Sequence, residues 1–306
     1  MIVDCHTHIW QPETQAGGAA LVHGNPAVVM SPLGGPDQTI ADATADNHLA
    51  SADPVDKTIV LGFKSRYLDM EISNELVSSY VRRHPQKLVG FAGVDPTNPS
   101  EAIDEMGVAH SRLGLKGITV SPAGQDFHPA DSRAVQVFAE ASRLKMPVLV
   151  HPGSFFSVGS KMEYARPALL DEVAREFPAL KLIIAHLGYP WMDECVVLLG
   201  KHSNVYADVS GLLHRQWQAF NALLTAYHYG VMDKLLFGSD FPFKSAAAAI
   251  EALYGINQFT LGTSLPTIPR QQLKGIVERD TLALLGIASP APVRQTSSEL
   301  ISDEEW

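Results

Sequence analysis

Two histidines separated by one residue stand near the start of the chain, in the segment "MIVDCHTHIW". Side chains alternate across an extended strand, so His6 and His8 are expected to point one way and Thr7 the other. Two imidazoles on one side of a strand form a chelating pair for a divalent metal ion. An isolated His-x-His pair is as often exposed or capped without any ligand, so the rest of the sequence has to decide.

Three further polar residues, His151, His186 and Asp240, each end a short apolar run, in "VLVHPG", "LIIAHLGYPW" and "LLFGSDFPF". A lone histidine after a buried strand is usually a packed core or loop residue. Four histidines and one aspartate at four separate strand ends are harder to explain in that way. Three imidazoles and a carboxylate suit Zn(II) or a similar divalent ion, which lowers the pKa of a bound water or polarises a carbonyl group. One of the five groups would then serve as an acid or base.

Asp240 and His186 each have two interpretations. An aspartate in "GSD" can simply cap the next helix, but the strand-like "KLLFG" before it and the need for an anionic ligand favour a metal ligand that is also a general base. His186 can hydrogen-bond only within its loop, yet a neutral imidazole beside a cation can polarise a carbonyl or transfer a proton. We favour a functional role for both residues.

The strand-like runs that carry these residues recur along the chain, separated by amphipathic segments such as "SRAVQVFAEASRLK". From the second run onward their starts lie roughly 23 to 34 residues apart, close to a βαβ unit. The eight candidates cover residues 2–5, 57–63, 87–94, 113–120, 147–151, 181–186, 204–209 and 234–238. This order favours an α/β fold of the closed (β/α)8 TIM-barrel type, whose active site lies at the carboxyl ends of the strands. An open doubly wound sheet would need a glycine-rich turn where this chain has "HTHIWQ".

The length of 306 residues fits one large domain, and we predict a single catalytic barrel over residues 1–288. Residues 11–45, rich in Gly, Pro and Ala, do not fit the repeat and are interpreted as a loop inserted beside the active-site mouth. The acidic tail, residues 289–306, is expected to be a poorly ordered terminus or an arm that packs on a partner subunit.

Composition excludes several classes of function. A net charge of -10 and a pI near 5.6 argue against binding to nucleic acid or to an anionic membrane surface, so we expect a small-molecule substrate. Cys5 and Cys195 form no disulfide framework, which indicates a reducing compartment, and alternation with His6 predicts that Cys5 faces the helix layer. We see neither a secretion signal nor a membrane-spanning stretch, and therefore expect a cytoplasmic protein.

The segments "DCHTHIW", "VLVHPG", "IIAHLGYPW" and "FGSDFPF", together with "LVGFAGVDP" and "LGLKGI", resemble the amidohydrolase-related family that includes aminocarboxymuconate-semialdehyde decarboxylase and resorcylate-type decarboxylases. The resemblance spans roughly residues 1–287. It implies a barrel enzyme that assembles as a homo-oligomer, a dimer by expectation. It also implies one divalent ion, Zn first with Mn or another ion as alternatives, and an acid/base or substrate-orienting role for His186. The ligands that it implies are His6, His8, His151 and Asp240.

The chain departs from related patterns at three places. Lys116 in "GLKGI" stands where dinuclear relatives carry a carboxylated lysine, but mononuclear members share the same text, so we expect a lysine that is not a ligand and whose ammonium pairs with a carboxylate. Nucleases of the TatD type also begin with HxH, but their strand-four glutamate is missing from "RLGLKGITV". Near the C-terminus, "ERDTLALLG" lacks the usual "NA", at a distance from the site.

Residues that recognise the substrate are harder to identify. Several aromatic residues closely follow strand ends and could contact a planar substrate, although such residues are as often packing residues. They are Trp10, Phe155, Phe156, Tyr189, Trp191, Phe241 and Phe243. Lys64, Arg66 and Arg215 could anchor a substrate carboxylate, an arginine by a bidentate pair. Surface solvation is the alternative for all three, and for Lys64 it is the preferred one.

Three functions compete. The first is a metal-dependent hydrolase in which Asp240 deprotonates water that attacks an amide, lactone or related carbonyl. The second is a nonoxidative decarboxylase of an aromatic or enoic acid, in which Asp240 or His186 delivers a proton to carbon. The third is a non-catalytic barrel, which the retention of all five polar groups argues against. We place hydrolysis slightly ahead of decarboxylation.

Overall fold

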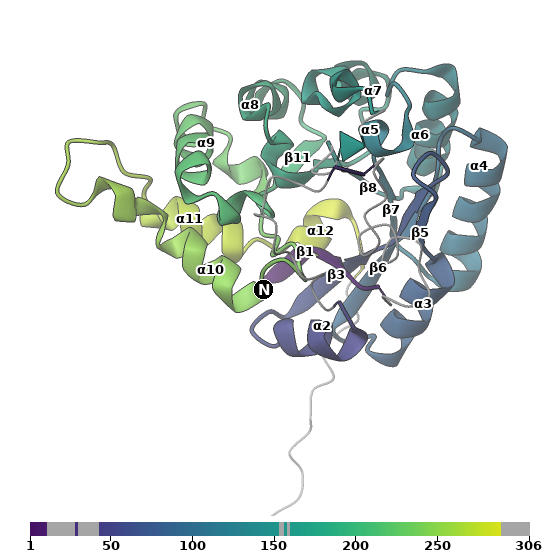
Figure 1. Ribbon diagram of the computed structural model, residues 1–306, viewed down its shortest axis with the longest axis horizontal. Helices are drawn as coiled ribbons and strands as arrows, with labels where there is room; N and C mark the ends of the chain where they lie inside the picture. Colours follow the sequence, from purple (N-terminus) through teal and green to yellow (C-terminus); the bar gives the residue numbers. More distant parts are fainter. Residues whose placement is uncertain (11–27, 30–42, 153–155, 158–159, 289–306) are drawn as a thin grey trace, which may run out of the picture.

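The computed structural model describes residues 1–10, 28–29, 43–152, 156–157 and 160–288. Within these residues, eight parallel strands form one sheet in the order of the chain (Figure 1), as the sequence analysis predicted. They are β1 (Val3–His8), β3 (Lys57–Leu61), β6 (Leu88–Gly93), β7 (Gly117–Val120), β8 (Val148–Val150), β10 (Leu182–Ile184), β11 (Val205–Asp208) and β12 (Leu235–Leu236). The backbone N–H of Cys5 donates to Phe237 O at 2.9 Å, and that of His8 donates to Phe241 O at 2.9 Å. Hydrogen bonds therefore join the first strand to the last, and the barrel is nearly closed.

Helices separate successive strands and cover the outside of the barrel (Figure 1). The α-helices are α2 (Ala45–Ser51), α3 (Asn74–Arg83), α4 (Pro99–Val108), α5 (Pro122–Gln125), α6 (Ser132–Leu144), α7 (Asp171–Glu176), α8 (Met192–Lys201), α9 (Gln216–His228), α10 (Ala246–Tyr254), α11 (Arg270–Val277) and α12 (Thr281–Leu285). Shorter helical turns are the π-turn η1 (Ala109–Leu113) and the 3-10 turns η2 (Met162–Ala165), η3 (Pro167–Leu170), η4 (Ala185–Gly188), η5 (Leu212–His214), η6 (Met232–Lys234) and η7 (Ile256–Thr260). No helix of the described residues is both long enough and apolar enough to span a bilayer.

The buried apolar residues separate into two clusters because strand side chains alternate between two faces. The larger cluster lies between strands and helices, and it includes the strand residues Val60 and Val150 and the helical residue Phe138. The smaller cluster fills the barrel interior with residues such as Val3 and Ile59. Leu282 and Leu285 of α12 and Ile287 join this inner cluster. Helix α12 therefore covers the amino-terminal end of the barrel.

Strand β1 contains a bulge that the sequence analysis did not predict. Asp4 pairs with Thr58, and Thr7 pairs with Val60, so β1 has one more residue than β3 over this interval. Cys5 packs in the inner cluster beside Val3, and our prediction that Cys5 faces the helix layer is wrong. The extra residue breaks the alternation, which allows Cys5 and His6 both to face inward.

The remaining strands differ from prediction mainly in length. Residues 113–116 of the predicted fourth strand are not extended, because η1 continues to Leu113 and ends at Gly114 in a left-handed conformation with φ of 75°. Two small antiparallel ribbons were not predicted: β2 (Val28–Val29) pairs with β9 (Phe156–Ser157), and β4 (Phe63–Ser65) pairs with β5 (Met70–Ile72). Apart from β2 and residues 43–45, the predicted insertion lies outside the described residues, as does the tail.

Candidate metal centre

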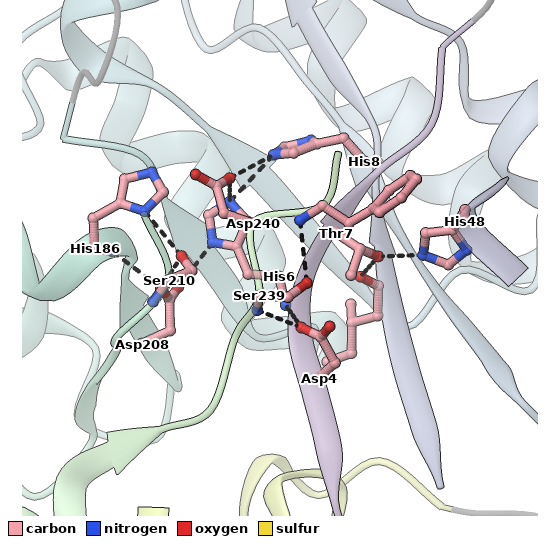
Figure 2. A network of polar contacts seen from close by, with 12 residues as sticks. Asp4, His6, Thr7, His8, His48, His186, Asp208, Ser210, Ser239 and Asp240 are labelled. Carbon is pink, nitrogen blue, oxygen red and sulfur yellow. Dashed lines mark hydrogen bonds and ion pairs between the residues drawn. The ribbon is translucent and has the colours of Figure 1, made fainter. Parts of the chain in front are cut away.

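The predicted ligand groups lie together at the carboxyl ends of the strands. His6 and His8 of β1 face Asp240, which follows β12 (Figure 2), and the ring of His151, which follows β8, lies beside both histidines. His6 Nε2 lies 3.2 Å from His8 Nε2 and 3.5 Å from Asp240 Oδ1. His8 Nε2 lies 3.9 Å from Asp240 Oδ1. The ligand atoms of His6, His8 and His151 all lie within 4.8 Å of one another. Ligands bound at about 2.0 to 2.2 Å to one ion are separated by distances of this size.

Asp208, at the end of β11, is a functional residue that the sequence analysis missed. Its Oδ2 lies 2.9 Å from His6 Nδ1, and its Oδ1 accepts the backbone N–H groups of His186 and Ser210, both at 3.0 Å. The Ser210 hydroxyl also donates to Oδ1. This carboxylate therefore orients the ring of His6 and leaves His6 Nε2 free to bind a cation, as metal-bound histidines require.

Burial and neighbouring charges favour the neutral form that a metal ligand needs at His8 and His151, but not at His6. Burial acts to raise the pKa of Asp208, but the charge and hydrogen bond of His6 outweigh it and hold that pKa well below its usual range. Burial lowers the pKa of His8 and of His151 far below normal, and the neighbouring His6 and His186 lower both further. His8 and His151 are thus kept neutral, with a lone pair available. Burial also acts to lower the pKa of His6, but Asp208 raises it overall.

His186 and Asp240 both have a left-handed backbone, with φ of 56° and 64°. Non-glycine residues rarely adopt this conformation, and where it occurs it often marks a functional site. Hydrogen bonds hold both residues there: His186 N donates to Asp208, and Asp240 N donates to His6 O at 3.0 Å. His186 Nδ1 lies 2.9 Å from Ser210 Oγ. Since that hydroxyl donates to Asp208, it accepts from His186 Nδ1, which leaves the lone pair of a neutral His186 on Nε2.

A separate observation supports the fit of the four predicted ligand residues to a divalent cation. His151 Nε2 is buried and has no hydrogen-bond partner among the described residues. A buried imidazole nitrogen is ordinarily satisfied, and this atom is therefore available to bind a cation. A second group, His6, His186 and Asp208, is equally compact. The oxygens of Asp208 already accept four hydrogen bonds, so we assign this second group to orientation of the first.

Lys116 does not belong to the candidate metal centre. Lys116 precedes β7, is exposed, and so lies at the opposite end of the strand from the ligand groups. It cannot bridge a second ion there, which agrees with the expectation that it is not a ligand. Contrary to that expectation, no described carboxylate lies within ion-pair distance of its ammonium.

A hydrogen-bonded group behind β1 supports the ligand strand from the helix side (Figure 2). Thr7 Oγ1 donates to Ile59 O at 2.7 Å and lies 2.8 Å from His48 Nε2. His48 is buried in α2, and its Nδ1 lies 2.8 Å from the Tyr80 hydroxyl. Thr7 is therefore held on the face opposite to the two ligand histidines, which fixes the direction of both.

Some of the predicted substrate-contacting residues lie beside this centre. The ring centroid of Trp10 is 6.3 Å from that of His8 and 6.0 Å from that of Phe243. Trp10 Nε1 is buried without a hydrogen-bond partner among the described residues. The guanidinium carbon of Arg215 lies 4.7 Å from the centroid of the Tyr189 ring, in the segment that follows His186. Trp10 therefore lies beside the ligand candidate His8, and Arg215 lies beside the segment that follows His186.

Other predicted residues are not brought to the centre. The guanidinium of Arg66 is more than half exposed and donates to Glu101 at 3.0 Å, and Lys64 pairs with Glu101 and Glu105. Phe241 is buried against His48 on the helix side, with ring centroids 5.2 Å apart. Trp191 is half-buried at the start of α8, and no described contact joins it to the ligands. Phe155 and the side chain of Phe156 lie outside the described residues.

Comparison with protein families gives one match that covers nearly the whole barrel. The family model described as Amidohydrolase matches residues 3–286. Among curated proteins, a dihydroorotase of Helicobacter pylori (strain HPAG1) is 28% identical over 106 residues, which are 35% of this chain and 30% of that protein. The match thus spans less than one third of the length of that curated relative.

Solved structures resemble the barrel over almost its full length at low sequence identity. A probable 2-pyrone-4,6-dicarboxylic acid hydrolase of Acinetobacter baumannii, with citric acid bound, has a TM-score of 0.62 at 17% identity, covering 94% of this chain and 99% of that one. A dihydroxybenzoic acid decarboxylase of Polaromonas sp. JS666, with bound manganese and the inhibitor 2-nitroresorcinol, has a TM-score of 0.64 at 16% identity, covering 93% and 96%. At these identities the likeness establishes the fold.

Proposed function

The chain belongs to the amidohydrolase family, and from this membership we propose that it is a metal-dependent decarboxylase that removes a carboxylate from a planar aromatic or enoic acid. The observation that carries the proposal is Trp10, whose ring lies beside His8 and whose buried Nε1–H has no acceptor among the described residues. A planar acid placed against this ring would supply the missing acceptor oxygen. The manganese and 2-nitroresorcinol held by the Polaromonas decarboxylase support the same class of ligand.

His6, His8, His151 and Asp240 would hold the cation, with Asp208 orienting His6. Manganese is the ion in the Polaromonas neighbour, and zinc suits the imidazole-rich set equally well. Bound there, the ion would act as a Lewis acid that neutralises the negative charge of the acid and of the developing carbanion.

The chain's own groups can manage the proton that decarboxylation consumes. The carbon–carbon bond to the carboxylate breaks, its electron pair stays with the substrate, and a proton must reach that carbon as CO2 leaves. His186 Nε2 can take up a proton and pass it on, because Nδ1 is held by Ser210 and burial lowers the pKa of the imidazole, which makes its protonated form a ready donor. Asp240, on the same side of the centre, is the alternative donor.

Hydrolysis of a lactone or amide is the second candidate, since the Acinetobacter neighbour and the Helicobacter relative carry such names. The sequence analysis placed hydrolysis slightly ahead. We reverse that order, because family membership supports hydrolysis only at the level of the superfamily, whereas Trp10 and the Polaromonas neighbour favour an aromatic acid.

The test is a substrate panel on protein loaded with Mn or Zn, with the metal content measured. The panel contains 2,6-dihydroxybenzoate, 5-carboxyvanillate, 2-pyrone-4,6-dicarboxylate and dihydroorotate, and both CO2 release and ring opening are followed. We expect CO2 from an aromatic acid, and loss of about 10²- to 10⁴-fold in kcat for Asp240→Asn. Asp233→Asn, an exposed aspartate of η6, is the matched control. Ring opening without CO2 release would establish the hydrolase instead.

A further inference from the structure

The loop after β11 carries two polar groups that the proposed chemistry does not use. His214 ends η5, and Arg215 follows it immediately before α9. His214 Nε2 and Arg215 Nη2 are both buried, and neither has a hydrogen-bond partner among the described residues. Only seven side-chain atoms in the described part of the chain share this property, and four of them belong to Trp10, His151, His214 and Arg215. Unsatisfied polar groups are thus concentrated around the metal centre.

The same loop lies directly against the reactive groups. A Cβ placed on Gly211 would be 2.6 Å from His186 Nδ1 and 3.1 Å from Asp240 Oδ2. The guanidinium of Arg215 stacks over Tyr189, three residues after His186. His214 is close enough to Lys244 and Asp240 for their charges to influence its pKa, which burial lowers first. The two groups therefore lie at the edge of the mouth beside Asp240.

Arg215 differs from the arginines that make surface ion pairs. Arg66, Arg143 and Arg166 each pair with a glutamate. No described carboxylate lies within ion-pair distance of Arg215, although one of its terminal nitrogens is buried. Removing a cation from water without a counterion is unfavourable, and stacking on Tyr189 offsets only part of that cost. The arrangement leaves guanidinium N–H groups available to an anion from outside the chain.

We propose that His214 and Arg215 form an anion-binding subsite beside the metal centre, which binds a second carboxylate of the substrate. This inference rests on the proposed function and narrows its substrate class to dicarboxylic acids. One carboxylate would lie at the cation, and Arg215 would bind the other through two parallel N–H groups. His214 Nε2 offers a further hydrogen bond.

Binding of inhibitors tests the subsite without any turnover. Benzoate is compared by calorimetry with benzene-1,2-, 1,3- and 1,4-dicarboxylate on Mn-loaded protein, so that different spacings of the two carboxylates are sampled. We expect at least one dicarboxylate to bind about tenfold more tightly than benzoate, as a charged hydrogen bond contributes. Arg215→Met should abolish this preference by reducing the affinity for the dicarboxylate towards that for benzoate, and Arg215→Lys should restore part of it. His214→Phe should reduce it.

Arg143→Met is the matched control, because Arg143 is exposed on α6 and pairs with Glu140. It should retain the full preference, and circular dichroism with thermal unfolding checks that each variant is folded. The proposal is overturned if no dicarboxylate binds more tightly than benzoate to the unchanged protein, or if Arg215→Met keeps the preference. Failure of the decarboxylase proposal would appear separately, as absence of CO2 release from proteins that still discriminate dicarboxylates in this binding measurement.

Discussion

Asp208 shows how one buried carboxylate organises the centre without being one of the proposed ligands. It accepts hydrogen bonds from the ring of His6 and from the backbone of His186, which come from different strands. One side chain thereby sets both the direction of the ring of His6, a proposed ligand, and the left-handed backbone of His186, the proposed proton-transfer residue. Its effect on function is expected through the geometry of its neighbours.

The first prediction concerns Asp208→Asn. The amide is nearly the same size but loses the negative charge that orients His6, so the dissociation constant for Mn or Zn should rise about 10- to 100-fold. Competition against a chromogenic chelator measures it. Asp131→Asn, at the partly exposed N-cap of α6, should leave the constant unchanged. Equal affinity in Asp208→Asn and the unchanged protein would contradict the role given to this carboxylate.

The second prediction concerns pH and His48, whose pKa burial lowers from 6.5 to about 4. Between pH 6.5 and about 4, His48 is protonated in the unfolded chain and neutral in the folded protein. The contribution of His48 to the free energy of unfolding is therefore fully present above pH 6.5 and is lost as the pH falls towards 4. In His48→Gln the free energy of unfolding, measured with urea, should depend on pH less steeply by about 1.4 kcal/mol per pH unit in this window. His228→Gln, at an exposed position, should keep the original slope.

At the scale of elements, the loop after β11 is shaped by Gly211. Its φ of 58° is left-handed, and a Cβ there would collide with the imidazole of His186. Gly230 also has a left-handed φ, of 73°, but a Cβ there would meet nothing within 4 Å. An alanine at Gly230 therefore tests the effect of a positive φ alone, and an alanine at Gly211 adds a collision with His186.

The third prediction follows from this pair. Gly230→Ala should lose about 1 kcal/mol of stability through its positive φ, and Gly211→Ala should lose at least as much. Gly211→Ala alone should displace His186 and lower kcat by about 100-fold, since proton transfer depends on its position. Thermal unfolding and steady-state kinetics on the same samples distinguish the two effects. Comparable kcat values in the two variants would show that Gly211 does not position the imidazole.

Features that depend on neighbouring residues in the chain could be predicted from the sequence, whereas features that depend on pairing between distant segments could not. The barrel and the five polar strand ends could be predicted because each apolar run is followed directly by the residue in question. Asp208 ends "VYAD" in the same way, so a signal for it was present and was overlooked. The bulge in β1 leaves no mark in the sequence, because it depends on pairing with β3. Hence the inward position of Cys5 could not be predicted from alternation.

The residues that bind substrate were less predictable, because an arginine is available to a substrate only where no carboxylate of the chain forms an ion pair with it. Arg66 and Arg215 both follow a strand closely, and the sequence does not distinguish them. In the structure Arg66 forms an ion pair with Glu101 of α4, whereas no described carboxylate lies within ion-pair distance of Arg215. That difference arises between segments far apart in the chain. The expected homo-oligomer also stays a prediction, which light scattering can test.

At the scale of the whole molecule, the first and last strands meet at the metal centre. Asp240 N donates to His6 O, and His8 N donates to Phe241 O, so the hydrogen bonds that close the barrel lie between the proposed ligands. A cation that binds His6, His8 and Asp240 together would hold this seam closed. Metal binding and barrel closure should therefore be linked.

The fourth prediction is that chelation loosens the seam. A ligand at 100 times its dissociation constant stabilises the folded state by about 2.7 kcal/mol, so removing the ion should lower the melting temperature by about 5 to 10 °C. Hydrogen exchange should increase in β1 and in residues 237–241 more than in β6 and β7. Uniform change across all strands would contradict a local link. Restoring the ion serves as the control for damage by the chelator.

The position of helix α12 has a consequence for substrate binding and product release. Side chains fill the barrel interior, and Leu282 and Leu285 pack against its amino-terminal end, so a small molecule cannot pass through the barrel from one end to the other. Product must therefore leave from the end at which substrate binds, and slow product release would delay the binding of the next substrate.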